Sequence, residues 1–134
     1  MTRIEIQQTL PPRKVLATTR ATPRDLDARF AGGLDGSFAP SFEIREEAQR
    51  FVVRADVPGV APTDLTIFIA NDWVTVCGAR TDDTKTAHYR VYERTFGSFW
   101  RAFRLQPGVV ALGARAVLER GVLTLSVPKR TSFS

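Results

Sequence analysis

The chain has 134 residues, of which 43% are hydrophobic and 25% charged, and its formal net charge is +5. These values indicate one globular domain and exclude a wholly disordered chain. Because the basic residues are scattered among acidic ones, with no basic run of five or more, we interpret the charge as a solvated mixed surface. We therefore expect no nucleic-acid or membrane partner.

The chain has one cysteine, Cys77, so no disulfide can form within it. Its apolar neighbours in residues 73–77 favour a small buried side chain over a reactive thiol. No apolar stretch approaches the ~20 residues that cross a bilayer, and the N-terminus lacks the layout of a signal peptide. A free thiol fits a reducing compartment, so we expect a cytoplasmic protein.

Residues 1–40 are predicted to form a partly disordered, flexible N-terminal arm. Prolines and late glycines interrupt any regular apolar period there. One short helix is predicted within the arm, capped by Thr22, begun by Pro23 and ended by Gly32-Gly33. Ahead of it, Ile4-Glu5-Ile6 forms a short apolar pair of extended character.

From residue 41 onward, apolar residues recur at every second position, as they do in half-buried strands. Residues 51–55 form the first such run, which Pro58-Gly59 ends. Residues 65–69 and 73–77 form two more, joined by a tight turn at Asn71-Asp72. A polar loop and a short strand candidate at residues 89–92 come next.

The pattern continues to the end of the chain. Alternate residues from Phe99 to Leu105, Arg101 included, share one strand face, and residues 114–119 and 122–127 form two further strands before Pro128. Seven or eight short strands separated by turn signals, with no long helical pattern, predict an all-β sandwich or barrel.

No residue pattern supports an enzyme. The single histidine, His88, has no obvious Ser or Cys partner for a triad, and one histidine is too few for a zinc site. The glycines of residues 32–36 lack the Lys-Ser/Thr and the strand–helix context of a phosphate loop. We therefore expect no catalytic residues, no metal and no cofactor.

Aromatic and basic residues alternate in residues 96–104, which leaves a nucleic-acid-binding interpretation open. An aromatic, basic β face can stack bases, as oligonucleotide-binding barrels do. The alternative is that Phe99 and Phe103 form a core stripe on one face of an ordinary strand. We favour the core stripe because Leu105 shares that face.

Five segments, in order and spacing, resemble the small heat-shock protein, or alpha-crystallin, family in its bacterial form. They comprise residues 40–44, 51–60, 72–80, 92–99 and 116–129. The most specific contains Gly121-Val122-Leu123 and then Val127-Pro128-Lys129. One departure is Ala79, where the family has an acidic residue. The resemblance implies an immunoglobulin-like β-sandwich at residues 41–129, between the arm and a short C-terminal tail at 130–134.

The resemblance also implies a homodimer, in which a strand in a loop of one subunit joins the sheet of its partner. The corresponding loop here spans residues 80–94. Its predicted interface residues are Tyr89, Val91, Tyr92, Glu93 and Arg94. Because a buried arginine needs a partner, we expect Arg101 to meet a carboxylate near this interface, the alternative being a surface arginine on a twisted strand.

Family members carry an apolar groove that receives an isoleucine-x-isoleucine segment from a neighbouring C-terminal tail. The candidate groove residues here are Leu65, Ile67, Ile69, Ala116 and Leu118. Residues 130–134 hold no such segment, so large assemblies are not expected. Ile4-Glu5-Ile6 has the pattern at the other end, and we hypothesise that it docks in the groove, within or between dimers. The alternative is a disordered start with chance isoleucines.

The resemblance implies an ATP-independent holdase, which covers the apolar surface of unfolding client proteins and prevents their aggregation under stress. A flexible arm suits many client shapes. The expected apolar residues of the arm and its edge are Ile4, Ile6, Phe30, Leu34, Phe38 and Phe42. Two alternatives remain: a scaffold module on the same sandwich, and a nucleic-acid-binding β-barrel.

Overall fold

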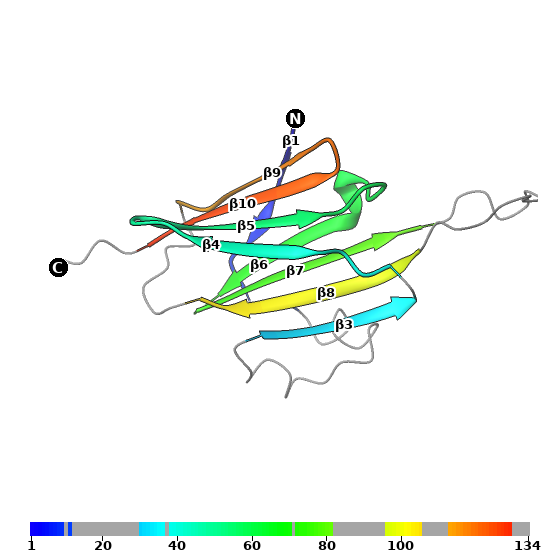
Figure 1. Ribbon diagram of the computed structural model, residues 1–134, viewed down its shortest axis with the longest axis horizontal. Helices are drawn as coiled ribbons and strands as arrows, with labels where there is room; N and C mark the ends of the chain where they lie inside the picture. The colour runs from blue at the N-terminus through cyan, green and yellow to red at the C-terminus, as the bar shows by residue number, and fades with distance from the viewer. Residues whose placement is uncertain are drawn as a thin grey trace, which may run out of the picture.

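The computed structural model describes residues 1–9, 11, 30–36, 38–70, 72–81, 96–105 and 113–129. In these residues, ten strands form two five-stranded sheets that lie face to face as two layers (Figure 1). The sequence-based prediction of an all-β sandwich is confirmed. A single turn of 3-10 helix, Pro62–Asp64, leads into one of the strands.

The first sheet has the strand order β1-β9-β10-β5-β4. Its strands are β1 (Thr2–Ile4), β9 (Arg115–Glu119), β10 (Val122–Pro128), β5 (Arg50–Asp56) and β4 (Phe42–Glu46), and every pairing is antiparallel. The predicted turn between β9 and β10 is present. Gly121 has a φ of +78° there, and an added Cβ would lie 3.1 Å from the Cα atom of Pro58. This position therefore favours glycine.

The second sheet has the strand order β2-β6-β7-β8-β3. Its strands are β2 (Ile6–Gln7), β6 (Leu65–Ala70), β7 (Trp73–Arg80), β8 (Gly97–Arg104) and β3 (Phe30–Gly36). β2 runs parallel to β6, and the other pairings are antiparallel. The register aligns Ile67, Val76 and Arg101 across the three central strands, so their side chains share the face toward the first sheet.

The core lies between the sheets, because the alternate residues of each strand point inward. In β10 these are Leu123, Leu125 and Val127, at most 1% exposed, while the residues between them are half-buried. A second, smaller apolar cluster is formed by Phe68, Cys77, Trp100 and Ala102, with Trp73 against it. Since these positions alternate with the core positions of β6, β7 and β8, the second cluster lies on the outward face of the second sheet.

The predicted end of the arm helix is wrong. Residues Phe30–Gly36 form β3, which pairs along β8 with Gly33 opposite Trp100. Gly32-Gly33 suggested a helix stop, but glycines also fit an edge strand, and the open edge of β8 is a distant partner that local sequence signals do not reveal. The remainder of the predicted helix, and the strand candidate at residues 89–92, lie outside the described residues.

Candidate binding groove and sheet edge

The predicted groove residues come from one strand of each sheet. Leu65, Ile67 and Ile69 are alternate residues of β6, and Ala116 and Leu118 are alternate residues of β9. All five are buried and belong to one apolar cluster. The structure therefore brings them together where the two sheets face each other.

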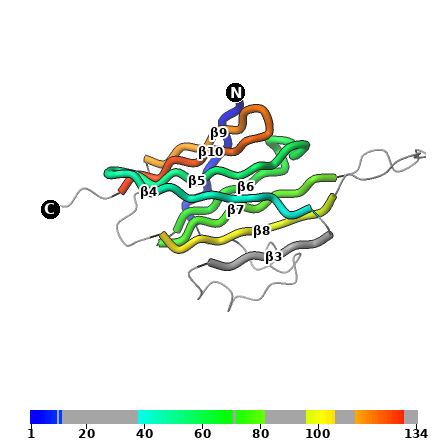
Figure 2. The backbone as a smooth tube through the Cα atoms, in the orientation of Figure 1, coloured from blue at the N-terminus to red at the C-terminus, as the bar shows by residue number. Residues whose placement is uncertain are grey.

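The first residues of the chain close this side of the sandwich. We call Thr2–Gln7, which includes both β1 and β2, the N-terminal strap. β1 pairs with β9, with Ile4 opposite Ala116, and β2 pairs with β6, with Ile6 opposite Ile67. The strap thus crosses from the edge of the first sheet to the edge of the second within one chain. Figure 2 shows it as the blue tube that runs from the N-terminus at one layer to the other layer.

Two isoleucines anchor the strap. Ile4 is 5% exposed and belongs to the core cluster, whereas Ile6 is partly buried and packs against that cluster. Glu5, between them, is exposed. Burying one isoleucine contributes about 1.5–3 kcal/mol, but ordering each backbone residue costs roughly 1–2 kcal/mol. With so few anchors, the free energy that holds the strap in place is small.

The strap is also incompletely packed on one side. An open depression of about 350 Å³ lies beside it, lined by Glu5, Ile6 and Gln8 from the strap side and by Ala114 and Arg115 ahead of and within β9. Side chains that border an open depression have fewer partner atoms than those in a filled core, so dispersion holds this side of the strap less strongly.

Among the described residues, the opposite edge of the first sheet is open. β4 pairs with β5, and no described residue pairs with its other edge. Ile44 lies opposite the buried Val53 in the register and is 40% exposed. A strand that is paired on one side only, with an exposed isoleucine, is a template for another strand. The predicted interface residues Tyr89, Val91, Tyr92, Glu93 and Arg94 lie outside the described residues.

Arg101 lies on the inward face of β8, as the sequence pattern predicted. Its guanidinium carbon is 4.8 Å from the ring centroid of Phe42 and 5.4 Å from that of Phe103. Burial lowers the pKa of this guanidinium. The aromatic rings offer it a cation–π environment. Its pairing with a carboxylate at a dimer interface stays a prediction.

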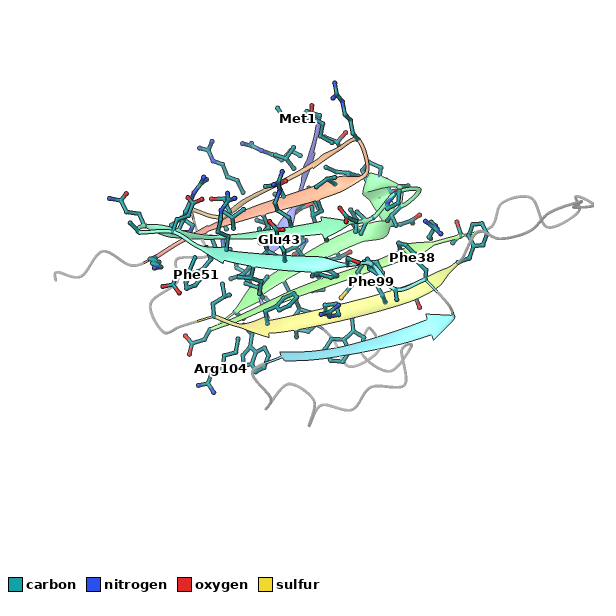
Figure 3. The ribbon with its side chains drawn as sticks, in the orientation of Figure 1. Met1, Phe38, Glu43, Phe51, Phe99 and Arg104 are labelled. Atoms are coloured by element: carbon teal, nitrogen blue, oxygen red, sulfur yellow. The ribbon has the colours of Figure 1, made fainter. Side chains whose placement is uncertain are left out.

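The predicted arm residues divide into three kinds. Ile4 and Ile6 belong to the strap, and the backbone of Phe30 and Leu34 lies in β3. Phe38 is 5% exposed, and its backbone N–H donates to the carbonyl oxygen of Phe96. Its ring packs edge-on to Phe99, with 5.9 Å between centroids, and the two are labelled in Figure 3. In this state Phe38 therefore faces the core and not a client.

Phe42 is half-buried in β4 and packs against the same core cluster. Its ring lies 6.2 Å from that of Phe99 and 5.4 Å from that of Phe103. Aromatic packing thus joins the open edge of the first sheet to the second sheet, beside the exposed Ile44.

Arg80 is a structural residue that the sequence analysis missed. At the end of β7, its Nη1 donates to the carbonyl oxygen of Pro58 at 2.8 Å, and its guanidinium carbon lies 4.2 Å from the ring centroid of Phe38. It therefore fixes the Pro58-Gly59 turn and Phe38 at the mouth of the loop predicted to join the partner. The sequence feature that could have indicated this role is the position of Arg80 where a predicted strand meets a polar loop.

The described residues carry no cluster of three or more His, Cys, Asp and Glu side chains that could hold a metal ion. Cys77 is 9% exposed, and burial raises the pKa of its thiol to about 12. This thiol is neutral at physiological pH and is a poor nucleophile. His88 lies outside the described residues. No described helix has both the length and the apolar character needed to cross a membrane.

Comparison with known proteins shows which family this chain resembles. The sequence profile of the Hsp20/alpha crystallin family matches residues 43–133. Spore protein SP21 of Stigmatella aurantiaca is 43% identical over 96 residues, which cover 70% of this chain and 57% of that protein. The 22.7 kDa class IV heat shock protein of Pisum sativum is 36% identical over 88 residues, covering 63% of this chain and 45% of that protein. The chain thus spans about half the length of these relatives.

Solved structures agree with the sequence matches. A small heat-shock protein from Xylella fastidiosa superposes with a TM-score of 0.66 at 33% identity, covering 72% of this chain and 91% of that one. HspA from Xanthomonas axonopodis superposes with a TM-score of 0.62 at 32% identity, covering 70% of this chain and 96% of that one. The similarity therefore extends over most of each of these two structures.

Proposed function

Because this chain belongs to the Hsp20/alpha-crystallin family of ATP-independent chaperones, we propose that it is a holdase. In this role it binds unfolding client proteins through apolar surfaces and slows their aggregation under stress, without nucleotide. A client that loses its tertiary structure exposes apolar side chains, and any surface that covers them lowers the rate of aggregation.

The observation that carries this proposal is the groove between β6 and β9. Its occupant in the structure, Ile4-Glu5-Ile6, is an extended segment with apolar side chains two residues apart and backbone pairing to both sheets. Unfolded apolar chains supply that pattern without any particular sequence. A groove that recognises it therefore suits many clients, and Leu65, Ile67, Ile69, Ala116 and Leu118 are the proposed client-binding residues.

We place a homodimer in this proposal. The open edge of β4, with Ile44 exposed, is a site for a strand from a partner subunit. Residues 80–94 are the proposed source of that strand, and Arg80 holds the beginning of this segment against Pro58. The free, buried Cys77 is consistent with the proposed cytoplasmic location.

Light scattering from a heat-unfolded model client tests the function. In ATP-free buffer, near-stoichiometric amounts of the protein are expected to suppress most of the scattering. An equal mass of an inert globular protein is the control for crowding. Undiminished scattering at several-fold excess would contradict the holdase proposal and favour a scaffold module that binds one specific partner.

A further inference from the structure

The strap differs from every other paired segment of the described chain. It places a three-residue strand on one sheet and a two-residue strand on the other, with Glu5 between them. No other described segment joins both sheets so closely in sequence. A short connection of this kind ties the two sheet edges together, and its release uncovers both edges at once.

Removing the strap would expose a binding site that is already shaped for an extended chain. The backbone edges of β9 and β6 would become unpaired, and Ala116 and Ile67 would lose the isoleucines that lie opposite them. Among the described residues, the strap contacts the groove through backbone pairing to β9 and β6 and through two apolar side chains at alternate positions. Another extended segment with that pattern makes the same contacts.

The strap is also easier to release than the other strands. Within the strap only Ile4 is buried, Ile6 is half-buried, and the other four residues are exposed. An open depression also lies beside Ile6. Elements with few buried apolar contacts open at a low free energy compared with the whole fold. Because the strap is held by few apolar contacts, an incoming strand at high concentration can displace it despite its covalent tether.

We propose that the N-terminal strap is an intramolecular competitor, which occupies the β6–β9 groove and must leave before an extended segment of another chain can bind there. Molecules with the strap in place cannot bind an incoming segment. The apparent affinity of the groove is therefore its intrinsic affinity multiplied by the fraction of molecules that are open. The idea that the strap controls client capture rests on the proposed holdase function. The test of competition for the groove does not depend on that function.

A reversible cross-link separates the closed state from the open one. Arg3 and Val117 are Cα partners on β1 and β9, and both alternate with core-facing residues, so their side chains lie on the outer face. The variant Arg3→Cys/Val117→Cys in a Cys77→Ala background locks the strap when it is oxidised and frees it when it is reduced. The matched control is Arg54→Cys/Thr124→Cys in the same background, which joins two central strands, β5 and β10, across the same face.

The probe is a fluorescent peptide of residues 1–9, and fluorescence anisotropy measures its binding to the full-length variants. We expect the oxidised strap-locked protein to bind it at least tenfold more weakly than the reduced form, and the oxidised control pair to bind it as its reduced form does. A peptide carrying Ile4→Asp and Ile6→Asp is expected not to bind. Equal binding to the locked and reduced forms overturns the proposal, as does failure of the strap pair to cross-link when the control pair does.

A second measurement tests whether release of the strap controls the capture of clients. Suppression of client scattering should be weaker for the locked protein than for its reduced form, at equal concentrations. If the locked protein excludes the peptide but suppresses client scattering as well as its reduced form does, the strap does not control client capture, and that part of the proposal is overturned. If no form suppresses scattering, the proposed function fails, while the peptide experiment still decides whether the strap and an incoming segment compete.

Discussion

At the scale of single residues, the sandwich depends on close packing on the inner face of its second sheet. Gly78 lies between Leu65 on β6 and Phe99 on β8. A Cβ atom added to Gly78 would be 2.7 Å from Cε1 of Phe99 and 2.9 Å from Cδ2 of Leu65. Phe99 is 1% exposed and Leu65 is 5% exposed, so neither side chain has room to move away. The glycine permits Phe99 to pack directly over β7.

The substitution Gly78→Ala is therefore expected to destabilise the protein by about 1–3 kcal/mol, the usual cost of overpacking a core. Urea denaturation followed by tryptophan fluorescence measures the change. The control is Ala79→Ser, at the half-buried neighbouring position of the same strand, which should change stability by less than about 0.5 kcal/mol. Equal stability of Gly78→Ala and the natural protein would show that Phe99 repacks freely.

Cys77 gives stability a dependence on pH. Burial raises the pKa of its thiol from the ordinary value of 9.0 to about 12, so the folded protein keeps the proton to a higher pH than the unfolded chain does. The stabilisation is fully present below pH 9 and is lost as the pH rises from 9 through 12, by at most about 1.4 kcal/mol per pH unit.

We therefore expect the free energy of unfolding to fall more steeply between pH 9 and 11 in the natural protein than in Cys77→Ala. Denaturant titrations at several pH values measure both slopes, and the other titrating groups act equally in the two proteins. Parallel slopes would mean that the thiol is solvated in the folded state.

At the scale of strands and turns, the sequence predicted most of what alternation and turn residues control. β5, β6, β7, β8, β9 and β10 all overlap a predicted alternating run, and the turn residues Pro58-Gly59 and Gly121 lie between strands as expected. In these segments the local preference and the buried face agree, so the pattern alone was sufficient.

Two elements could not be predicted in this way, because they depend on distant partners. β3 is rich in glycine and is a strand only because the edge of β8 is available to it. The strap has a visible pattern in Ile4-Glu5-Ile6, but its register and its docking within the same chain depend on where β6 and β9 meet. For the candidate site, the five groove residues could be named from their alternation and the family resemblance. The contacts of Arg80 with Pro58 and Phe38 join segments distant in sequence, so no local pattern predicts them.

The open edge of β4 leads to a prediction about assembly. If a partner strand covers this edge, Ile44→Lys introduces a charge into the contact and should shift the protein from dimer toward monomer. Size exclusion with in-line light scattering measures the mass. Glu43→Lys is the matched control, because Glu43 lies on the outer face of the same strand opposite Arg54. An unchanged mass for Ile44→Lys, or an equal effect of both variants, would place the dimer contact elsewhere.

At the scale of the whole molecule, the two outer faces differ in character. Across the first sheet the register aligns Glu43, Arg54, Thr124, Val117 and Arg3, a mostly polar row. Across the second sheet it aligns Cys77 and Trp100, both buried. At the end of the first sheet, exposed ion pairs such as Arg50–Glu47 at 2.8 Å and Lys129–Glu46 at 2.7 Å add little stability individually. The polar outer face of the first sheet is suited to contact with water, and apolar binding is therefore expected at the groove and at the sheet edges.

A holdase acts by forming a complex with an unfolding client. The most direct measurement is the mass and composition of the species present after the two are heated together in ATP-free buffer, by size exclusion with in-line light scattering. We expect a soluble species that contains both proteins and carries most of the client. Recovery of the protein at its own mass, with the client in the pellet, would contradict the proposed holdase function.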